Sequence, residues 1–325
     1  MRLIILHNLR VVKNELIPNF ITKILKFFKI KPKLKLGILS QHKPRKIDLS
    51  RFNTKNIETK GFSPSISIVT PSFNQGKYVL ETIASILGQN YSNLTYRVQD
   101  GGSSDETLAI LKNIESDKFS YESMTDKGQA NAINLGFAKG GCSEIMGWIN
   151  SDDVLLPGAL ATVANYFYQN PDIDIVYGNR LIINEENKLI GRWVMPKHDD
   201  EILSWVDYIP QETLFWRRRA WESIGSQLDE SFKFALDWDL ILRFRSAGMR
   251  FARIPKFLGM FRVHGLQKTS TQISSTGADE MKRILFRTHG RVPSQLEIDD
   301  HIRSYLHRNR FVDSMWSIRH LSFLK

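Results

Sequence analysis

Two adjacent carboxylates, Asp152 and Asp153, follow a predicted strand of apolar and aromatic residues that is expected to run straight into them. Two neighbouring acids repel each other, and each costs free energy to desolvate unless a positive charge compensates it. A divalent cation such as Mg²⁺ or Mn²⁺ can compensate both, because it prefers carboxylate oxygens and shares them with the phosphates of a ligand. The alternative is a solvated turn in which one of the acids caps a helix that begins at Pro157. The pair alone leaves both interpretations open.

Polar side chains also follow the earlier strands of the chain. Short β-branched or aromatic runs predict strands over residues 65–70, 95–99 and 119–123. Asn74, Asp100 and Asp126 follow these three strands in turn. Strand and helix alternate four times with short loops, which predicts a mostly parallel sheet with right-handed crossovers. Ligands of such sheets bind at the carboxyl ends of the strands, so the gathered acids indicate a cation or a polyhydroxyl ligand.

The loops between these elements carry helix-capping residues. Asn74 is expected to cap a helix whose apolar face runs from Tyr78 to Leu87. Ser103 or Ser104 is expected to cap the next helix, with acids in its first turn.

Composition and charge set limits on the function. The chain has 325 residues, of which 42% are apolar, and one cysteine, which is typical of a globular protein without a disulfide framework and favours a reducing compartment. Residues 1–47 hold 12 Lys and Arg against one acid, Glu15, so the rest of the chain is neutral overall. A neutral body lacks the basic stripe that nucleic-acid binding requires, and we expect no nucleic-acid partner.

The basic amino-terminal arm, residues 1–48, contains a two-faced segment. Over residues 17–30 the apolar side chains fill one half of a helical wheel and three lysines the other. Such a helix suits an anionic lipid surface, so residues 17–46 are predicted to contact a membrane. The alternative is a helix packed on the body, followed by a Pro-containing linker. No apolar run is long enough to span a bilayer.

Several other chemistries lack their sequence patterns. No G-x-G-x-x-G follows the first strand, and the chain has no P-loop, no C-x-x-C zinc pattern and no G-x-S-x-G nucleophile elbow. These absences argue against hydride transfer, P-loop phosphoryl transfer, a zinc ribbon and α/β-hydrolase chemistry.

Three motifs in this order resemble the family 2 glycosyltransferases of the GT-A fold: Pro71-Ser72-Phe73-Asn74, Asp100-Gly101-Gly102-Ser103-Ser104-Asp105 and Asn150-Ser151-Asp152-Asp153. The resemblance covers about residues 64–270. It implies an α/β, Rossmann-like sheet flanked by helices, with a mixed acceptor-side half. Residues 271–325 then form a helical C-terminal extension.

The resemblance also implies a donor site. In the family, the acid that matches Asp100 holds the nucleotide base, the segment that matches Ser151 and Asp152 binds the ribose, and Asp153 binds Mn²⁺ or Mg²⁺. Many members carry an acid where this chain has Ser151. The implied nucleotide-sugar-binding residues are Pro71, Ser72, Asn74, Asp100, Gly102, Ser103, Asp126, Gln129, Asn131, Ser151 and Asp152.

A second informative stretch lies around Asp237, where a helix is predicted to begin. The family places its general base here, as an acidic pair, and this chain has Leu236 in place of the first acid. Asp237 is therefore the implied base, which needs to lie within hydrogen-bond reach of an acceptor hydroxyl. The alternatives are a helix N-cap for Asp237 and a first-turn acid for Asp239.

Further residues are implied on the acceptor or diphosphate side of the site. These candidates are Gln211, Trp238 and Arg262, and His264 is a second candidate metal ligand. Gln211 could equally be a turn amide, and a lone histidine such as His264 is often structural. Trp216 and Trp221 are expected in the core.

The region after the acids predicts short strands over residues 173–177, 180–183 and 188–194, the last two forming a hairpin. Residues 276–325 are predicted to be helical, without residues that indicate chemistry.

Together these features predict an inverting, metal-dependent glycosyltransferase that moves one sugar from a nucleotide-diphosphate-sugar, with UDP favoured, to a glycan or lipid-linked acceptor in surface-polysaccharide, lipopolysaccharide or capsule synthesis. The expected location is cytoplasmic and peripheral on the inner face of the cell membrane. Leu236 and Ser151 leave open a catalytically silent relative that binds nucleotide-sugar and acts as a membrane-associated scaffold. A sugar nucleotidyltransferase would need a Gly-rich basic loop where residues 71–76 stand.

Overall fold

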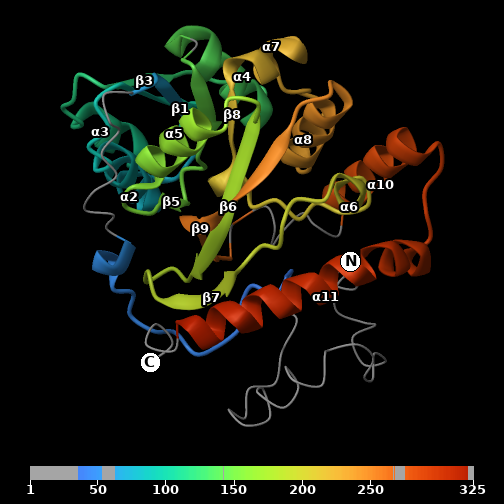
Figure 1. The fold of residues 1–325 in the computed structure, drawn as a ribbon. Coiled ribbons are helices and arrows are strands. Elements are labelled where there is room, and N and C mark those ends of the chain that lie inside the picture. The colour runs from blue at the N-terminus through green and yellow to red at the C-terminus, as the bar shows by residue number, and fades with distance from the viewer. Residues whose placement is uncertain (1–35, 53–62, 142, 266, 268–274, 321–325) are drawn as a thin grey trace.

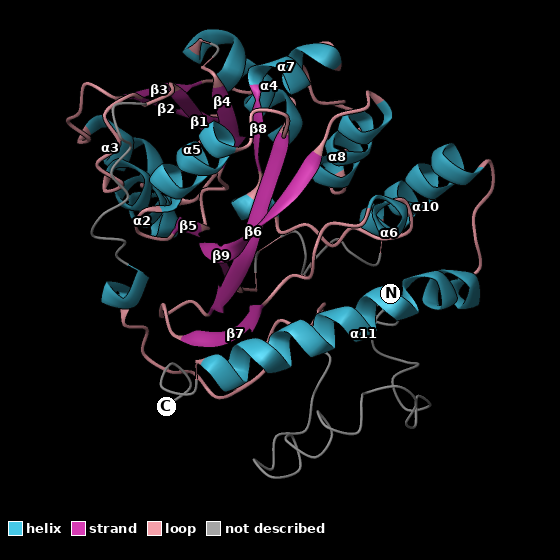
Figure 2. Ribbon diagram, in the orientation of Figure 1, coloured by secondary structure: helices cyan, strands magenta, loops and turns pink. Residues whose placement is uncertain are grey.

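The computed structural model of the chain describes residues 36–52, 63–141, 143–265, 267 and 275–320. The amphipathic helix predicted over residues 17–30 lies outside the described residues. Figures 1 and 2 show a twisted sheet with helices packed around it. No helix of the described segments is long and apolar enough to cross a membrane.

Strand and helix alternate in the first half of the body, as predicted. The strands are β1 (Ile66–Ser72), β2 (Leu94–Asp100), β3 (Phe119–Ser123) and β4 (Ile145–Trp148), and the helices are α2 (Gly76–Leu87), α3 (Thr107–Lys112), α4 (Gln129–Gly140) and α5 (Ala159–Gln169). The four strands are parallel in the order β3-β2-β1-β4. Their carboxyl ends therefore share one edge, which is where the sequence places its polar residues.

The central strand β1 separates two apolar clusters. Ile66 and Ile68 belong to the cluster that includes the apolar face of α2, whereas Val69 packs with α4. Helix α4 lies so close to β1 that a Cβ on Gly136 would stand 2.4 Å from Val69 Cγ1. A glycine at this position thus lets α4 lie directly on the strand and brings its first turn to the carboxyl edge of the sheet.

The second half of the sheet is mixed. It contains β5 (Val154–Leu155), β6 (Ile175–Ile183), β7 (Leu189–Trp193), β8 (Phe215–Arg217) and β9 (Phe251–Arg262). β8 is antiparallel to β4 and β6, and β9 runs parallel to β6. The hairpin of β6 and β7 is confirmed. The two strands predicted over residues 173–177 and 180–183 are one strand, because Gly178 and Asn179 stay extended within β6.

Short helices connect these strands, and two longer ones follow them. They are η1 (Leu49–Phe52), α6 (Asp200–Leu203), η2 (Gln211–Thr213), α7 (Arg218–Ser223), α8 (Leu236–Ser246), α10 (Thr276–His289) and α11 (Gln295–Arg319). Helix α11 lies along β7 (Figure 1). Buried polar contacts join the two, including the ion pair of Arg192 with Asp313 at 3.1 Å and the bond from Asn309 Nδ2 to the carbonyl of Val194. The helical C-terminal region therefore packs on the sheet.

The described end of the basic arm also packs on the sheet. The backbone N–H of Gln41 donates to the carbonyl of Ile190, and Arg45 forms an antiparallel bridge with Leu189. The Trp193 indole donates to the carbonyl of Ile38. The interpretation of this part of the arm as a free linker was wrong, because its backbone pairs with the outer edge of β7.

Candidate active site

The loop after β2 is organised by Asp100, whose side chain is fully buried. Its Oδ2 accepts hydrogen bonds from the backbone N–H groups of Gly102 and Ser103 and from the Ser123 hydroxyl, at 3.1, 2.9 and 2.6 Å. Its Oδ1 accepts from the Ser103 hydroxyl at 2.5 Å. Both oxygens are thus used within the protein, so Asp100 shapes the loop at which the sequence predicts base binding.

The loops after β1 and β2 bind each other. The backbone N–H of Asn74 donates to Ser103 Oγ at 2.7 Å, and Asn74 Oδ1 accepts from the backbone N–H of Ser104 at 2.9 Å. Asn74 itself adopts a left-handed conformation with φ 52°. Asp105 Oδ2 accepts from the backbone N–H of Gly76 at the start of α2. These contacts fix the two loops as one unit.

The helix caps predicted in these loops were wrong. Gln75, not Asn74, is the N-cap of α2, and Glu106 is the N-cap of α3; neither side chain makes a cap bond. Asn74, Ser103 and Ser104 instead use their side chains to join the loops. A left-handed Asn74 also leaves the Phe73 ring 61% exposed beside the loop.

Asp126 and Asn131 shape the third loop. Asp126 Oδ1 accepts from the backbone N–H of Gly128 at 2.7 Å, and Asn131 Oδ1 accepts from the backbone N–H of Lys127 at 3.1 Å. The Asn131 amide donates to Glu230 at 2.8 Å. Of the remaining donor-side candidates, Pro71, Ser72 and Ser151 are buried at the same carboxyl edge.

A chain of amides crosses the end of β4. Gln129 Nε2 donates to Asn150 Oδ1 at 2.8 Å, Asn150 Nδ2 donates to Gln211 Oε1 at 2.9 Å, and Gln211 Nε2 donates to the carbonyl of Trp148 at 2.9 Å. Asn150 Nδ2 also lies 3.4 Å from Asp153 Oδ2. Gln211 is therefore a buried member of this site and not a solvated turn amide.

The two adjacent acids lie in the turn between β4 and β5, not at the end of a strand, because β4 stops at Trp148. Asp153 is 2% exposed, and its Oδ1 accepts from the backbone N–H of Arg262 at 3.0 Å. Asp152 Oδ2 lies 2.9 Å from His264 Nε2. Burial raises the pKa of Asp153 well above its usual value, and the neighbouring charges of Asp152 and Glu212 raise it further.

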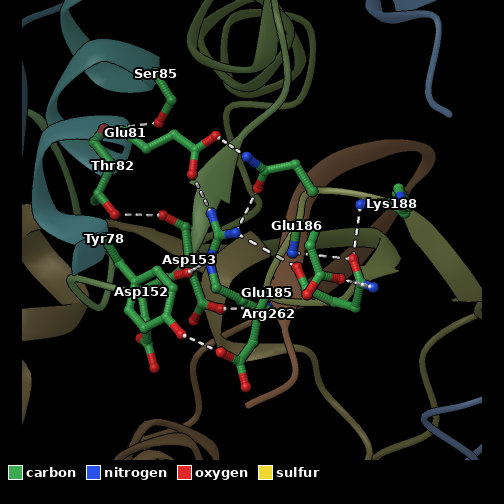
Figure 3. A network of polar contacts seen from close by, with 12 residues as sticks. Tyr78, Glu81, Thr82, Ser85, Asp152, Asp153, Glu185, Glu186, Lys188 and Arg262 are labelled. Carbon is green, nitrogen blue, oxygen red and sulfur yellow. Dashed lines mark hydrogen bonds and ion pairs between the residues drawn. The ribbon is translucent and has the colours of Figure 1, made fainter. Parts of the chain in front are cut away.

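The side chain of Arg262 binds several neighbouring segments and holds them together (Figure 3). Its side chain is 1% exposed, its Nη2 binds Glu81 Oε2 at 2.6 Å, and its Nε donates to the carbonyl of Asp152 at 2.8 Å. Its Nη1 binds Asn187 in the β6–β7 hairpin, and the guanidinium lies over the Tyr78 ring. This arrangement contradicts a diphosphate role for Arg262, because its donors are enclosed and occupied.

Asp237 lies in the first turn of α8 and is half-buried. The N-cap is Ala235, so Asp237 is not the helix cap. Glu280 of α10 accepts hydrogen bonds from the backbone N–H groups of Lys233, Phe234 and Ala235 at 2.7, 2.9 and 2.9 Å. A carboxylate from the C-terminal region thus anchors the segment that presents Asp237.

The two side chains that follow Asp237 are structural. Trp238 is 2% exposed, and its indole donates to the carbonyl of Leu203 at 2.9 Å. The expectation that Trp238 contacts acceptor or diphosphate was wrong, because its ring packs in the core. Asp239 is fully buried and pairs with Arg287 at 2.5 Å. The placement of Trp216 and Trp221 in the core is confirmed.

A buried arginine connects the two acidic regions. Arg180 of β6 forms two hydrogen bonds to the fully buried Glu212. Asp153 and Asp207 both interact electrostatically with Arg180, and Asp207 also with Asp237. Asp153 and Asp207 therefore share one cation, and Asp207 in turn interacts with Asp237 at the start of α8. Arg180 is not among the site residues predicted from the sequence. An arginine within an otherwise apolar strand could have indicated a buried ion pair.

The acids fit a divalent cation by their chemistry. Asp153 is a buried carboxylate with two acids beside it, and burial, followed by the charges of these acids, raises its pKa. Carboxylate oxygens and an imidazole nitrogen suit Mn²⁺, and carboxylates suit Mg²⁺. In the described part of the chain, however, no three such side chains converge closely enough to hold an ion. A groove of about 780 Å³ beside α8 and α10 is lined by none of the candidate site residues.

Comparisons with known proteins identify the family of the chain. The sequence model of the family described as Glycosyl transferase family 2 matches residues 67–252. An uncharacterised glycosyltransferase of Rickettsia prowazekii is 29% identical over 222 residues, which are 66% of this chain and 68% of that protein. The chondroitin synthase of Escherichia coli is 29% identical over 206 residues, which are 62% of this chain but only 29% of the synthase.

A solved structure resembles the fold. TarS 1–349 of S. aureus, in complex with UDP-GlcNAc, superposes with a TM-score of 0.56 at 15% identity and covers 75% of this chain and 72% of its own. At this identity the likeness concerns the fold alone.

Proposed function

The chain belongs to glycosyltransferase family 2 and has the GT-A fold, and from this premise we propose that it moves a single sugar from a nucleotide-diphosphate-sugar to a hydroxyl of a glycan or lipid-linked glycan. UDP is the favoured nucleotide, because TarS, whose fold is similar, was solved with UDP-GlcNAc and with UDP. Related proteins include polysaccharide synthases, which supports an acceptor in surface-polysaccharide synthesis.

The observation that supports the proposal is that acids from distant segments surround Arg180. Asp153 of the β4–β5 turn and Asp207 of the loop before η2 both interact with Arg180, and Asp207 also interacts with Asp237 of α8. A transferase needs a diphosphate-binding group and a base on opposite sides of the sugar's reacting carbon. In this proposal Asp153 belongs to the diphosphate-binding group and Asp237 is the base.

Asp153 and His264 are the candidate ligands that would hold Mn²⁺ or Mg²⁺ together with the donor, because the described side chains do not form a three-ligand site by themselves. When bound, the ion would offset the negative charge of the donor diphosphate. The protein's own part is to keep these groups in place: Arg262 fixes the Asp153 carboxylate through its backbone N–H, and Asn150 approaches the other Asp153 oxygen.

On the donor side, the joined loops after β1, β2 and β3 would hold the nucleoside. The exposed Phe73 ring offers a face for a base beside the loop that Asp100 shapes. Base stacking on an aromatic ring contributes about 1–3 kcal/mol. Asp126, Gln129 and Asn131 would line the other side of the same crevice.

On the acceptor side, Asp237 would accept the proton of the attacking hydroxyl while its oxygen bonds to the anomeric carbon and the bond from that carbon to the diphosphate breaks. Direct displacement of this kind inverts the configuration at the anomeric carbon. Gln211 accepts a hydrogen bond from Asn150, which also approaches Asp153. Gln211 would thereby keep the end of β4 in place against η2.

Donor turnover tests this function. In the presence of Mn²⁺, the purified chain should release UDP from one member of a panel of UDP-sugars. Asp153→Ala should abolish the release and the thermal stabilisation by UDP with metal. A chain that binds UDP with metal but releases none from any donor or acceptor would favour the silent scaffold.

The basic arm supports a peripheral location on an anionic membrane, which would be the inner face of the cell membrane for a cytoplasmic enzyme. Its residues 36–45 are held by β7, so the lysine-rich segment before them would start from a fixed point on the body. Flotation with phosphatidylglycerol vesicles tests this: replacing Lys23, Lys26 and Lys29 by Glu should release the protein, and unchanged binding would contradict the proposal.

A further inference from the structure

Helix α4 is joined by side-chain hydrogen bonds to the segment before α8, residues 228–235. Asn131 and Asn134 lie three residues apart, on one face of α4. Both side-chain amides donate to Glu230 Oε1, at 2.8 and 3.1 Å. Asn134 also exchanges two hydrogen bonds with the backbone of Leu228, accepting its N–H at 2.8 Å and donating to its carbonyl at 3.1 Å. Helix α4 therefore holds this segment at two points.

Charges from both sides of this contact face Glu230. The hydrogen bond from Asn131 is the main reason why the pKa of Glu230 lies below its usual value, and the charges of Lys127 and Lys233 lower it further. Lys233 Nζ also donates to the carbonyl of Lys127 at 2.8 Å. Glu230 is thus an ionised acceptor at neutral pH, and Lys233 forms a second link between its segment and the loop after β3.

The loop after β3, residues 124–128, is closed by bonds that do not involve Glu230. Asp126 Oδ1 accepts the backbone N–H of Gly128, and Asn131 Oδ1 accepts that of Lys127. Leu228 keeps its two bonds to Asn134 without Glu230 as well. Loss of the Glu230 carboxylate is therefore expected to free the middle of the segment and to leave the loop and the start of the segment in place.

The other end of the segment is held by α10. The Glu280 carboxylate accepts the backbone N–H groups of residues 233–235, and the Arg283 guanidinium lies 3.6 Å from the centre of the buried Phe232 ring. Two residues after Ala235, the first turn of α8 presents Asp237. The short segment before Asp237 is thus fixed to α4 through Glu230 and to α10 through Glu280.

We propose that Glu230 is a positioning residue that fixes the segment before α8 against α4 and so sets the place of Asp237 relative to the loop after β3. This inference rests on the proposed roles of Asp237 as base and of that loop in holding the donor. In the transfer the acceptor's proton goes to Asp237, and Glu230 neither gains nor loses a proton. A displacement of about 1 Å in a reacting group can cost about 10²-fold in rate, so release of the segment slows transfer without weakening donor binding.

The first test is independent of catalysis. Amide hydrogen exchange is measured for the full chain, for Glu230→Ala and for Glu230→Gln, which keeps an oxygen that accepts the two amides. Glu222→Ala, at an exposed acid of α7, is the control. Glu230→Ala should speed exchange over residues 231–237 by about 10-fold and leave residues 124–131 unchanged, because only local contacts are lost, while the other two variants exchange as wild type does. Unchanged exchange over residues 231–237, or equal acceleration along the whole chain, would overturn the proposal.

The second test uses donor turnover with Mn²⁺. Glu230→Ala should lower kcat by about 10-fold, with the KM for the UDP-sugar and the Kd of UDP within about threefold of wild type. Glu230→Gln should restore kcat to within about threefold. A raised KM with an unchanged kcat, or a Glu230→Gln variant as slow as Glu230→Ala, would overturn the proposal. A wild type without turnover would count against the proposed function, while hydrogen exchange still decides whether Glu230 fixes the segment.

Discussion

The carboxylate of Glu280 accepts the backbone N–H of Ala235, the residue that precedes α8, at 2.9 Å. The same carboxylate also accepts the N–H groups of Phe234 and Lys233. Of these groups only the N–H of Ala235, the N-cap, belongs to the helix end that lacks intrahelical partners, and a carboxylate there also suits the helix dipole. Helix α10 therefore supplies the cap that α8 lacks in its own sequence, two residues before Asp237.

Removing this cap should weaken both the fold and the site. Glu280→Ala leaves three N–H groups without their acceptor, and a hydrogen bond to a charged group is worth about 1.5–3 kcal/mol. We expect a loss of about 3 kcal/mol in the free energy of unfolding, measured by urea denaturation. The neighbouring Asp279→Ala, whose side chain is 81% exposed, is the control and should change stability little. Equal losses in the two variants would contradict this role of Glu280.

The closeness of α4 and β1 makes a second prediction. Gly136→Ala places a Cβ 2.4 Å from Val69 Cγ1, and overpacking of a core typically costs about 1–3 kcal/mol. Stability should fall by that amount, because α4 must move off the strand. Gly140→Ala, where a Cβ would meet Arg97 at an ordinary 3.6 Å, should be close to neutral. A stable Gly136→Ala variant would mean that α4 has room to shift.

Much of this arrangement follows from local sequence. The sequence predicts a polar edge at the carboxyl ends of parallel strands, from the strand-forming runs, the loops that contain Asn74 and Asp100, and the acids before residue 157. The structure has these parallel strands and that edge. The pattern succeeds here because buried strands and their following loops are determined by short-range periodicity and turn chemistry.

What the sequence could not predict depends on contacts between distant segments. Arg262 reads as a free cation near the site, but it is buried because Glu81 and the β6–β7 hairpin close over it. From the sequence, Trp238 is an aromatic residue next to the proposed base and a candidate for ligand contact. In the structure, however, its indole N–H donates a hydrogen bond to the carbonyl of Leu203. Glu280 stands 45 residues from Ala235, and periodicity carries no signal at that distance.

The ion pair at the centre of the acids provides a third prediction. Glu212→Gln leaves Arg180 without its buried partner, and breaking one side of a buried pair costs about 3–5 kcal/mol. The free energy of unfolding should fall by that order in urea denaturation. Exchanging both, with Arg180→Leu and Glu212→Leu, should restore part of the stability. If the double variant is less stable than Glu212→Gln, Arg180 is needed chiefly by the other acids.

A fourth prediction concerns pH. Burial lowers the pKa of His198 below its usual value, and the hydrogen bond that its Nε2 donates to Asp200 opposes this only in part. The unfolded chain then binds a proton more readily, so stability is lost as pH falls from about 6.5 towards the lowered pKa. His198→Asn should reduce this loss between pH 7 and pH 5 in thermal melts. The exposed His307→Asn is the control, and an equal effect of both would contradict the assignment.

The direct test of the central claim is the rate of UDP release from the best UDP-sugar donor, measured with Mn²⁺ for wild type and for Asp237→Asn, alongside donor affinity by titration. The account predicts that Asp237→Asn binds donor as wild type does but turns it over about 10²–10⁴-fold more slowly, as expected when a general base is removed. An Asp237→Asn variant with wild-type turnover would contradict the account.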